Sequence, residues 1–213
     1  MNLYAAIEEI YGTFISYLEN SRCILLHPNS RYRSALVARL INSPDHKVFY
    51  YALGPDDISV PSIIAGMTHD VANQNPMFGR HINMLDPDES ENLEKLLATF
   101  IRDLSELSSE PFVLILDEYD RGDVADDIQW FVEKLVANLP DHCRIVINSR
   151  TLPRLPWVAM IAEGRAIMLD DDRLIRDNFY DIQGHGKHDL EVYALGPGFV
   201  LSIDKPIDTW EGH

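Results

Sequence analysis

The sequence predicts a three-layer α/β fold built on a mainly parallel sheet of five strands, followed by a short β tail. Short apolar runs alternate along the chain with longer stretches whose apolar residues recur at helical spacing. The run at 112–116 is apolar without alternation, which is typical of a central parallel strand covered on both faces. Parallel strands need right-handed crossovers, and these place helices on both faces of the sheet.

The individual elements follow from the same patterns. We expect helices at 3–18, 34–41, 88–107 and 127–139. We expect strands at 22–26, 47–53, 111–116, 144–148 and 165–169. A polar stretch covers about 70–87, and two further strands are expected at 190–195 and 199–203, on either side of a Gly-Pro-Gly turn.

The charge of the chain excludes some partners. The sequence holds 34 acidic and 18 basic side chains, so its formal net charge is −16. Proteins gain most of their affinity for nucleic acids from Lys and Arg that neutralise phosphates, so these residues are not expected to bind DNA. The same charge disfavours binding to an anionic membrane surface.

Cysteine usage and hydropathy predict a cytoplasmic chain. Cys23 and Cys143 lie far apart beside strand-like runs, which is typical of buried reduced thiols. Residues 1–18 contain no basic leader. No apolar run approaches the ~18 residues that a membrane span requires.

Two carboxylates follow the apolar run 112–116 directly. Phosphoryl-transfer sites place an acid at the end of a buried strand, where it holds Mg²⁺, and a second carboxylate can orient the attacking water. On this interpretation Asp117 holds the metal and Glu118 is the catalytic base. The alternative is that the strand simply ends in acids that open the next loop.

The segment His27-Pro-Asn-Ser-Arg-Tyr-Arg-Ser34 lies between an expected strand and an expected helix. It has the length and place of a phosphate-binding loop, G-x-x-x-x-G-K-[ST]. In that alignment Ser34 replaces the Mg²⁺-binding hydroxyl and Arg33 the lysine, whereas His27 and Tyr32 occupy the two glycine positions. The candidate nucleotide-binding residues are therefore Pro28, Asn29, Ser30, Arg31, Tyr32, Arg33 and Ser34, with Ser34 and Asp117 as the candidates for Mg²⁺.

The missing glycines have a physical consequence. Glycines let the loop adopt conformations closed to other residues and bring amide N–H groups close to phosphate. A tyrosine held in a left-handed conformation would cost ~1–3 kcal/mol, so we expect the loop at Tyr32 to have a different shape. Arg33 keeps the positive charge, but its planar fork is bulkier than an ammonium group. We therefore expect binding of ATP or ADP with Mg²⁺ to be weak or absent, and no efficient turnover.

A third polar group ends the expected strand 144–148, where Asn148 is followed by Ser149 and Arg150. Such a tip can contact a γ-phosphate; the alternative is that Arg150 pairs with Asp117 or Asp120. Ligands of parallel α/β sheets bind beyond the carboxyl ends of the strands, so the three polar groups should converge on one crevice.

With these residues identified, the chain resembles the P-loop ATPase domain of the MalT-like signal-transduction ATPases (STAND class), found in LuxR-type bacterial transcription regulators. The resemblance covers about 3–174 and implies a P-loop NTPase-like domain at 1–174. In that family, nucleotide and inducer together shift a closed form to a self-associating one. The resemblance rests on Arg22-Cys-Ile-Leu-Leu leading into Arg33-Ser34, on Leu114-Ile-Leu-Asp-Glu-Tyr119, and on Ile145-Val-Ile-Asn-Ser-Arg150-Thr-Leu-Pro153.

The C-terminal part resembles the opening β-hairpin of an OmpR-type winged-helix DNA-binding domain. The residues concerned are Leu190-Glu-Val-Tyr-Ala-Leu-Gly-Pro-Gly198, Lys205-Pro-Ile207 and Trp210. The resemblance implies a linker at 175–189, a truncated hairpin at 190–213, and a longer regulator of which this chain is a fragment. No recognition helix follows, so the fragment is not expected to read DNA.

Three functions are compatible with these observations. The first is a regulatory NTPase-like domain with weak or lost hydrolysis, which relays a signal to a DNA-binding module of the same longer chain and can self-associate. The second is an active signalling ATPase with an atypical phosphate loop. The third is a ligand-free scaffold that meets a basic partner, and it predicts a collapsed crevice with Tyr32 or Arg33 folded into the phosphate position.

Overall fold

The computed structural model describes residues 3–86, 89, 91–122, 125–175, 192–194 and 200–202. Its centre is a five-stranded sheet with the strand order β2-β3-β4-β1-β5, in which every neighbouring pair is parallel. The predicted three-layer α/β fold with a parallel sheet of five strands is confirmed. The strands are β1 (Cys23–Leu26), β2 (Lys47–Ala52), β3 (Phe112–Asp117), β4 (Cys143–Asn148) and β5 (Ala166–Leu169).

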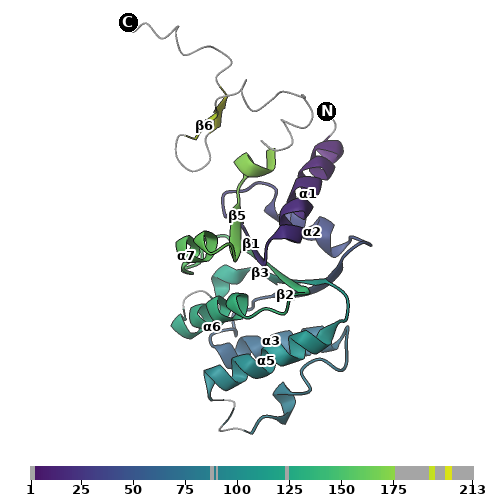
Figure 1. Cartoon of the computed structure of the whole chain (residues 1–213), viewed down its shortest axis with the longest axis vertical. Coiled ribbons are helices and arrows are strands. Elements are labelled where there is room, and N and C mark those ends of the chain that lie inside the picture. Colours follow the sequence, from purple (N-terminus) through teal and green to yellow (C-terminus); the bar gives the residue numbers. More distant parts are fainter. Residues whose placement is uncertain are drawn as a thin grey trace, which may run out of the picture.

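Two separate layers of helices cover the two faces of the sheet (Figure 1). Successive residues of β3 alternate between them: Leu114 packs in one apolar cluster and Ile115 in the other. Both are almost fully buried, which explains why the sequence of this strand shows no alternation. One layer holds α3 (Val60–Ala72), α5 (Leu93–Leu107), α6 (Asp126–Ala137) and α7 (Trp157–Ala162), and the other holds α1 (Leu3–Asn20) and α2 (Arg33–Ile41).

The predicted helix 88–107 starts later than expected. Regular helix α5 begins at Leu93, because Asn92 caps it: the Asn92 side chain accepts a hydrogen bond from the amide of Lys95 at 3.0 Å. The short 3₁₀ helix η1 (Ile82–Met84) lies within the polar stretch 70–87, for which the sequence predicted no regular structure. Asp103 of α5, which is buried, accepts hydrogen bonds from the amides of His81 and Ile82 and so holds η1 on α5.

Two helices, α3 and α7, were not predicted from the sequence. Helix α3 begins with a capping box in which the side chains and amides of Ser59 and Ser62 bond reciprocally, and Pro61 lies in its first turn. Helix α7 is only six residues long, too short for its apolar period to be recognised. Trp157 starts it, and its indole N–H donates to the carbonyl of Pro153 at 2.9 Å.

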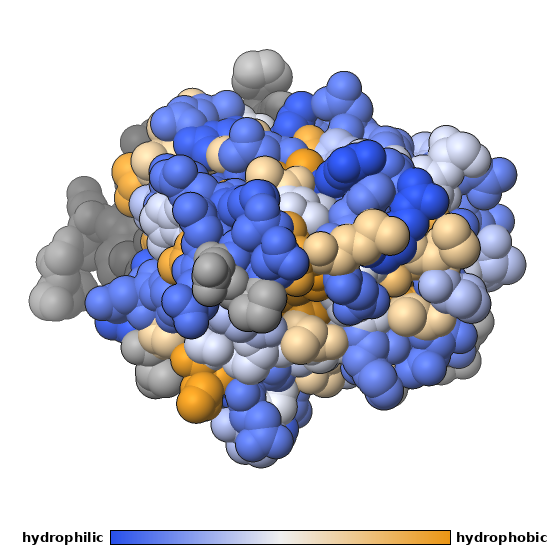
Figure 2. All heavy atoms as spheres, turned by 90° about the horizontal axis from the view of Figure 1, so that it is seen from below, coloured by the Kyte–Doolittle hydropathy of each residue, from blue (hydrophilic) through white to orange (hydrophobic). Residues whose placement is uncertain are grey.

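In the C-terminal part, β6 (Val192–Ala194) and β7 (Val200–Ser202) pair antiparallel, at the positions of the two expected tail strands. Residues 176–191, 195–199 and 203–213 lie outside the described part, and with them nearly all of the expected linker and the turn between the strands. None of the helices in the described part is long and apolar enough to span a membrane. The face seen from below is covered mainly by hydrophilic residues, with apolar ones between them (Figure 2).

Substitution of Leu114 by alanine should lower the free energy of unfolding by about 2–5 kcal/mol, because Leu114 is 1% exposed in the central strand. Ile58 is 69% exposed, so Ile58→Ala is the matched control and should change stability by no more than about 0.5 kcal/mol. Urea denaturation followed by circular dichroism measures both. Equal destabilisation by the two substitutions would contradict this assignment of the core.

Candidate functional site

The three polar groups expected at the site come from the carboxyl ends of β1, β3 and β4. The strands are parallel, and their register pairs Leu26 with Asn148 and Leu116 with Ile147. The same edge of the sheet therefore holds loop 27–34, the acids Asp117 and Glu118, and the segment that begins at Asn148. Strand β4 lies between β3 and β1. In the described part of the chain, no hydrogen bond joins loop 27–34 directly to Asp117.

Three amide groups of the loop are bonded within the loop itself. The amide of Ser30 donates to the carbonyl of His27 at 2.8 Å, and the amide of Asn29 donates to His27 Nδ1 at 3.2 Å. The amide of Tyr32 donates to the hydroxyl of Ser30 at 3.3 Å. Ser30 is buried, and the loop is anchored to β5 by a bond from the amide of His27 to the carbonyl of Leu169. These donors would otherwise be available to a phosphate.

The amide of Arg31 has an acceptor from another part of the chain. It donates to Asp171 Oδ1 at 3.1 Å, and Arg31 Nε donates to Asp171 Oδ2 at 3.0 Å. Asp171 opens a helical turn at 171–175 directly after β5. A carboxylate of the protein is thus bound by both the backbone and the guanidinium of a loop residue, as an anionic ligand would be.

The end of the loop differs from a glycine-rich phosphate loop. Tyr32 has φ −95° and ψ −10°, a right-handed conformation, so the expectation of a different loop shape is confirmed. Helix α2 starts at the next residue, with no side-chain cap and no acid in its first turn. The guanidinium of Arg33 donates to the carbonyl of Pro28 at 3.4 Å and so folds back over the loop, while Ser34 is exposed.

Asp117, the candidate Mg²⁺ residue, is surrounded by donors from the protein. Its Oδ1 accepts bonds from Asn148 Nδ2 and from the amide of Glu118, both at 2.7 Å. Its Oδ2 accepts the hydroxyl of Tyr50 at 2.8 Å. Burial, together with this bond to Asp117, raises the pKa of Tyr50 to about 12. The ends of β2, β3 and β4 are therefore joined through one carboxylate.

Glu118, the candidate base, stands in an unusual backbone position. Its φ of 50° and ψ of 36° are left-handed, and it is the one non-glycine residue of the described part with a positive φ. Such a position costs about 1–3 kcal/mol and needs support from its surroundings. The chain turns here into the 3₁₀ helix η2 (Tyr119–Arg121), and the Glu118 carboxylate forms an ion pair with Arg121.

Arg150 pairs with Asp120, which is one of the two alternatives that the sequence left open. The Arg150 amide donates to Asp120 Oδ1 at 2.9 Å, and the guanidinium donates to Oδ2 at 2.8 and 3.0 Å. Burial alone would raise the pKa of Asp120, but the hydrogen bonds from Arg150 outweigh it and lower the pKa. Arg150 is thereby oriented toward an acid of the protein.

Two residues of this edge, Tyr50 and Asp171, were missed by the sequence analysis. Tyr50 lies within an expected strand, where an aromatic residue is ordinary, and only the register of β2 with β3 brings it beside Asp117. Asp171 follows the last expected strand in a run of three acids that predicts no more than a solvated turn. A position beyond the carboxyl end of a sheet strand was the available signal for Asp171, whereas Tyr50 lies within its strand and had no such signal.

This arrangement fits a magnesium nucleotide poorly. The loop amides described above have protein acceptors, and both oxygens of Asp117 have protein donors. In the part of the chain that the structure describes, no group of three or more His, Cys, Asp or Glu side chains is placed to hold a metal ion. The exposed Ser34 and the uncapped first turn of α2 are the groups of the loop that keep the character of a phosphate site.

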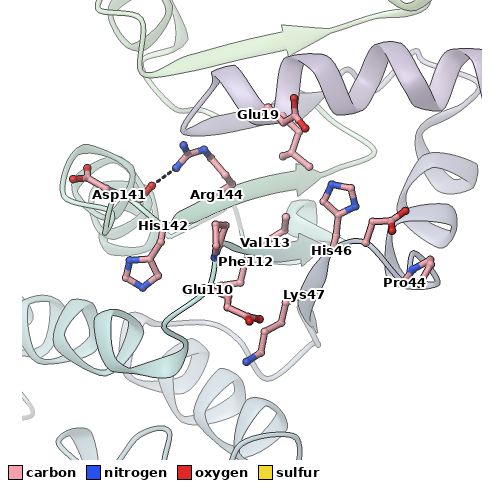
Figure 3. Close-up of a pocket in the computed structure, with 13 residues that line it drawn as sticks. Glu19, Pro44, His46, Lys47, Glu110, Phe112, Val113, Asp141, His142 and Arg144 are labelled. Atoms are coloured by element: carbon pink, nitrogen blue, oxygen red, sulfur yellow. Dashed lines mark hydrogen bonds between the residues drawn. The ribbon is translucent and has the colours of Figure 1, made fainter.

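A cavity of about 830 Å³ lies at the opposite edge of the sheet, beside the amino ends of β2, β3 and β4 (Figure 3). The figure shows the imidazoles of His46 and His142 on different sides of it, and Phe112 between them. Arg144 reaches into this region, but its guanidinium donates to the carbonyl of Asp141. The cavity is separate from the candidate site.

Comparison with known proteins adds to the description of the fold. No protein-family model matches the chain, and no curated protein matches its sequence. One similar structure is a chain of Drosophila ORC bound to AT-rich DNA and Cdc6, with a TM-score of 0.48 and 11% identity over 78% of this chain. Another is a chain of Drosophila ORC bound to DNA, with a TM-score of 0.47 and 10% identity over 79% of this chain. The matched region spans 55% of the first of those chains and 93% of the second, and the likeness concerns the fold alone.

The Tyr50–Asp117 contact predicts a pH-dependent stability difference between the wild type and Tyr50→Phe. Because the folded-state pKa of Tyr50 is raised from near 10 to about 12, the stability that its hydroxyl contributes is fully present below pH 10. That contribution should decline as the pH rises from 10 toward 12. Urea unfolding of both proteins at pH 7, 10 and 11 measures the difference, and a decline that is already complete at pH 10 would contradict the assigned pKa.

Proposed function

We propose that this chain is a regulatory NTPase-like domain with weak or lost nucleotide hydrolysis, which relays a signal to a DNA-binding module of the same longer chain. The observation that carries the proposal is the closed state of loop 27–34. The amides of residues 29–32 bond to His27, Ser30 and Asp171, all of them within the protein. A phosphate would have to break these bonds before it could use the same donors.

The acidic half of the site supports the same conclusion. Asp117 stands at the end of the central strand, as a metal-holding acid would, but its oxygens accept bonds from Tyr50 and Asn148. The proposed base Glu118 is held by Arg121. Efficient hydrolysis needs a metal and a free base in place together, so this edge favours a switch or scaffold over a catalyst.

The signalling part of the proposal comes from the resemblance of the sequence to MalT-like regulators. We propose a cytoplasmic location, self-association as a response, and the DNA-binding module as the intramolecular partner. Direct DNA binding by these residues is not proposed, because the net charge is −16. ATP or ADP with Mg²⁺ remains the proposed ligand, held weakly by Arg33, Ser34 and the first turn of α2.

A ligand-free scaffold is the second candidate, and one observation favours it. The Arg33 guanidinium donates to the carbonyl of Pro28, so the residue in the lysine position closes over its own loop. In that case the domain would act through protein contacts alone.

Calorimetric titration of Mg-ATP should show a Kd in the millimolar range or no measurable binding, because the loop donors are already bonded. Phosphate release should be flat and unchanged in Glu118→Gln. Arg33→Ala should remove any residual binding, whereas Arg102→Ala, which removes an exposed charge on α5, should not alter it.

Other outcomes select the other functions. Micromolar Mg-ATP binding that Arg33→Ala abolishes would establish a nucleotide switch with an intact site. Mg²⁺-dependent phosphate release that Glu118→Gln removes would establish an active ATPase. Each result would overturn the proposal of a weakened site.

A further inference from the structure

We propose that Asp171 is a built-in anion that closes loop 27–34, so that a phosphate group entering the loop must displace this carboxylate. The inference rests on the proposed function, because it concerns the regulation of the same loop. The ligand class is a phosphoanion, such as a nucleotide di- or triphosphate, and Asp171 is the protein group that competes with it.

The geometry of the contact is that of a bound anion. Both carboxylate oxygens of Asp171 lie within hydrogen-bond distance of the Arg31 amide, at 3.1 and 3.4 Å, and Oδ2 also accepts Arg31 Nε at 3.0 Å. The Asp171 side chain is 18% exposed, whereas that of Arg31 is 75% exposed. The acid is therefore held inside the protein surface, and the arginine closes over it from the solvent side.

The Asp171 carboxylate competes with phosphate for two reasons: it carries a negative charge, and it occupies the amide donor of Arg31. A backbone N–H donates to one anion at a time, and a carboxylate beside it repels an approaching phosphate. The Arg31 side chain of this ion pair is exposed, and ion pairs at the solvent boundary are weak, so a multiply charged phosphate is able to replace it. The amides of Asn29, Ser30 and Tyr32 bond to His27 and Ser30, and the amide of His27 bonds to the carbonyl of Leu169. Among these acceptors, Asp171 is the anionic one.

The position of Asp171 links the loop to the segment that leaves the sheet. Residues 171–175 form a helical turn directly after β5, which the bonds from the amides of Arg173 and Leu174 to Asp170 stabilise. Leu174 is fully buried among residues of α1 and α2. Displacement of the Asp171 carboxylate would therefore act on the turn that leads toward the C-terminal part of the chain, which provides a route from the loop to a downstream module.

The test is a calorimetric titration of the full 213-residue chain with inorganic pyrophosphate, and in parallel with Mg-ATP. Asp171→Asn should bind pyrophosphate with a Kd at least tenfold below that of the wild type, because it removes the competing charge. Glu94→Gln is the control, since it makes the same change in net charge at an exposed position on α5, and it should leave the Kd unchanged. In the double variant Asp171→Asn with Arg31→Gln, most of the gain should disappear.

The outcomes separate this inference from the proposed function. If Asp171→Asn binds pyrophosphate no more tightly than the wild type or Glu94→Gln, or if the double variant keeps the full gain, the role of Asp171 is overturned and the proposed function is unaffected. If the wild type already binds Mg-ATP at micromolar Kd, the proposed function fails, and the ratio between Asp171→Asn and the wild type still decides the role of Asp171. Asp171→Ser provides the same comparison should the asparagine variant not fold.

Discussion

The burial of β3 on both faces is the constraint on which the rest of the structure depends. Its alternate residues enter two different apolar clusters, so a shift of register by one residue would exchange the two sets of partners. The register with β2 and β4 is therefore fixed, and with it the point where Asp117 leaves the sheet beside Tyr50 and Asn148. The packing of β3 in the two apolar clusters therefore determines the position of the candidate site at the end of the strand.

Many polar groups of the site are bonded to other groups of the protein, and this is its main difference from a working phosphate site. Buried polar groups are satisfied in folded proteins, and a site built for a ligand leaves some donors and acceptors for it. Here the amide of Arg31 has Asp171, Asp117 has Tyr50 and Asn148, and Arg150 has Asp120. At the carboxyl edge of the sheet, the amide of Arg31 and the carboxylates of Asp117 and Asp120 are therefore bonded to other groups of the protein. Two buried atoms of the site, Arg33 Nε and Asn148 Oδ1, have no hydrogen-bond partner among the described residues.

The parts of the structure that could be predicted from the sequence were those set by strong apolar patterns. The unbroken apolar run of β3 and the helical spacing of apolar residues in α5 predicted both elements. Helix α3 was missed although Val60, Ile63 and Met67 recur at helical spacing, so the sequence carried a signal that the prediction did not use. The partners of Asp117 and Arg31 could not be predicted, because Tyr50 and Asp171 are remote in sequence and only the sheet brings them near. The left-handed backbone of Glu118 likewise has no local sequence signal, since glutamate rarely adopts it.

The left-handed backbone of Glu118 limits which residue types can occupy this position. Glu118 is followed immediately by the fully buried Tyr119, so the kink fixes how the chain enters the core after the strand. A β-branched residue would fit this conformation badly, and glycine would fit it without strain but would lose the ion pair with Arg121. A substitution of Glu118 therefore changes two things at once: the charge at this position and the stability of the η2 turn that follows it.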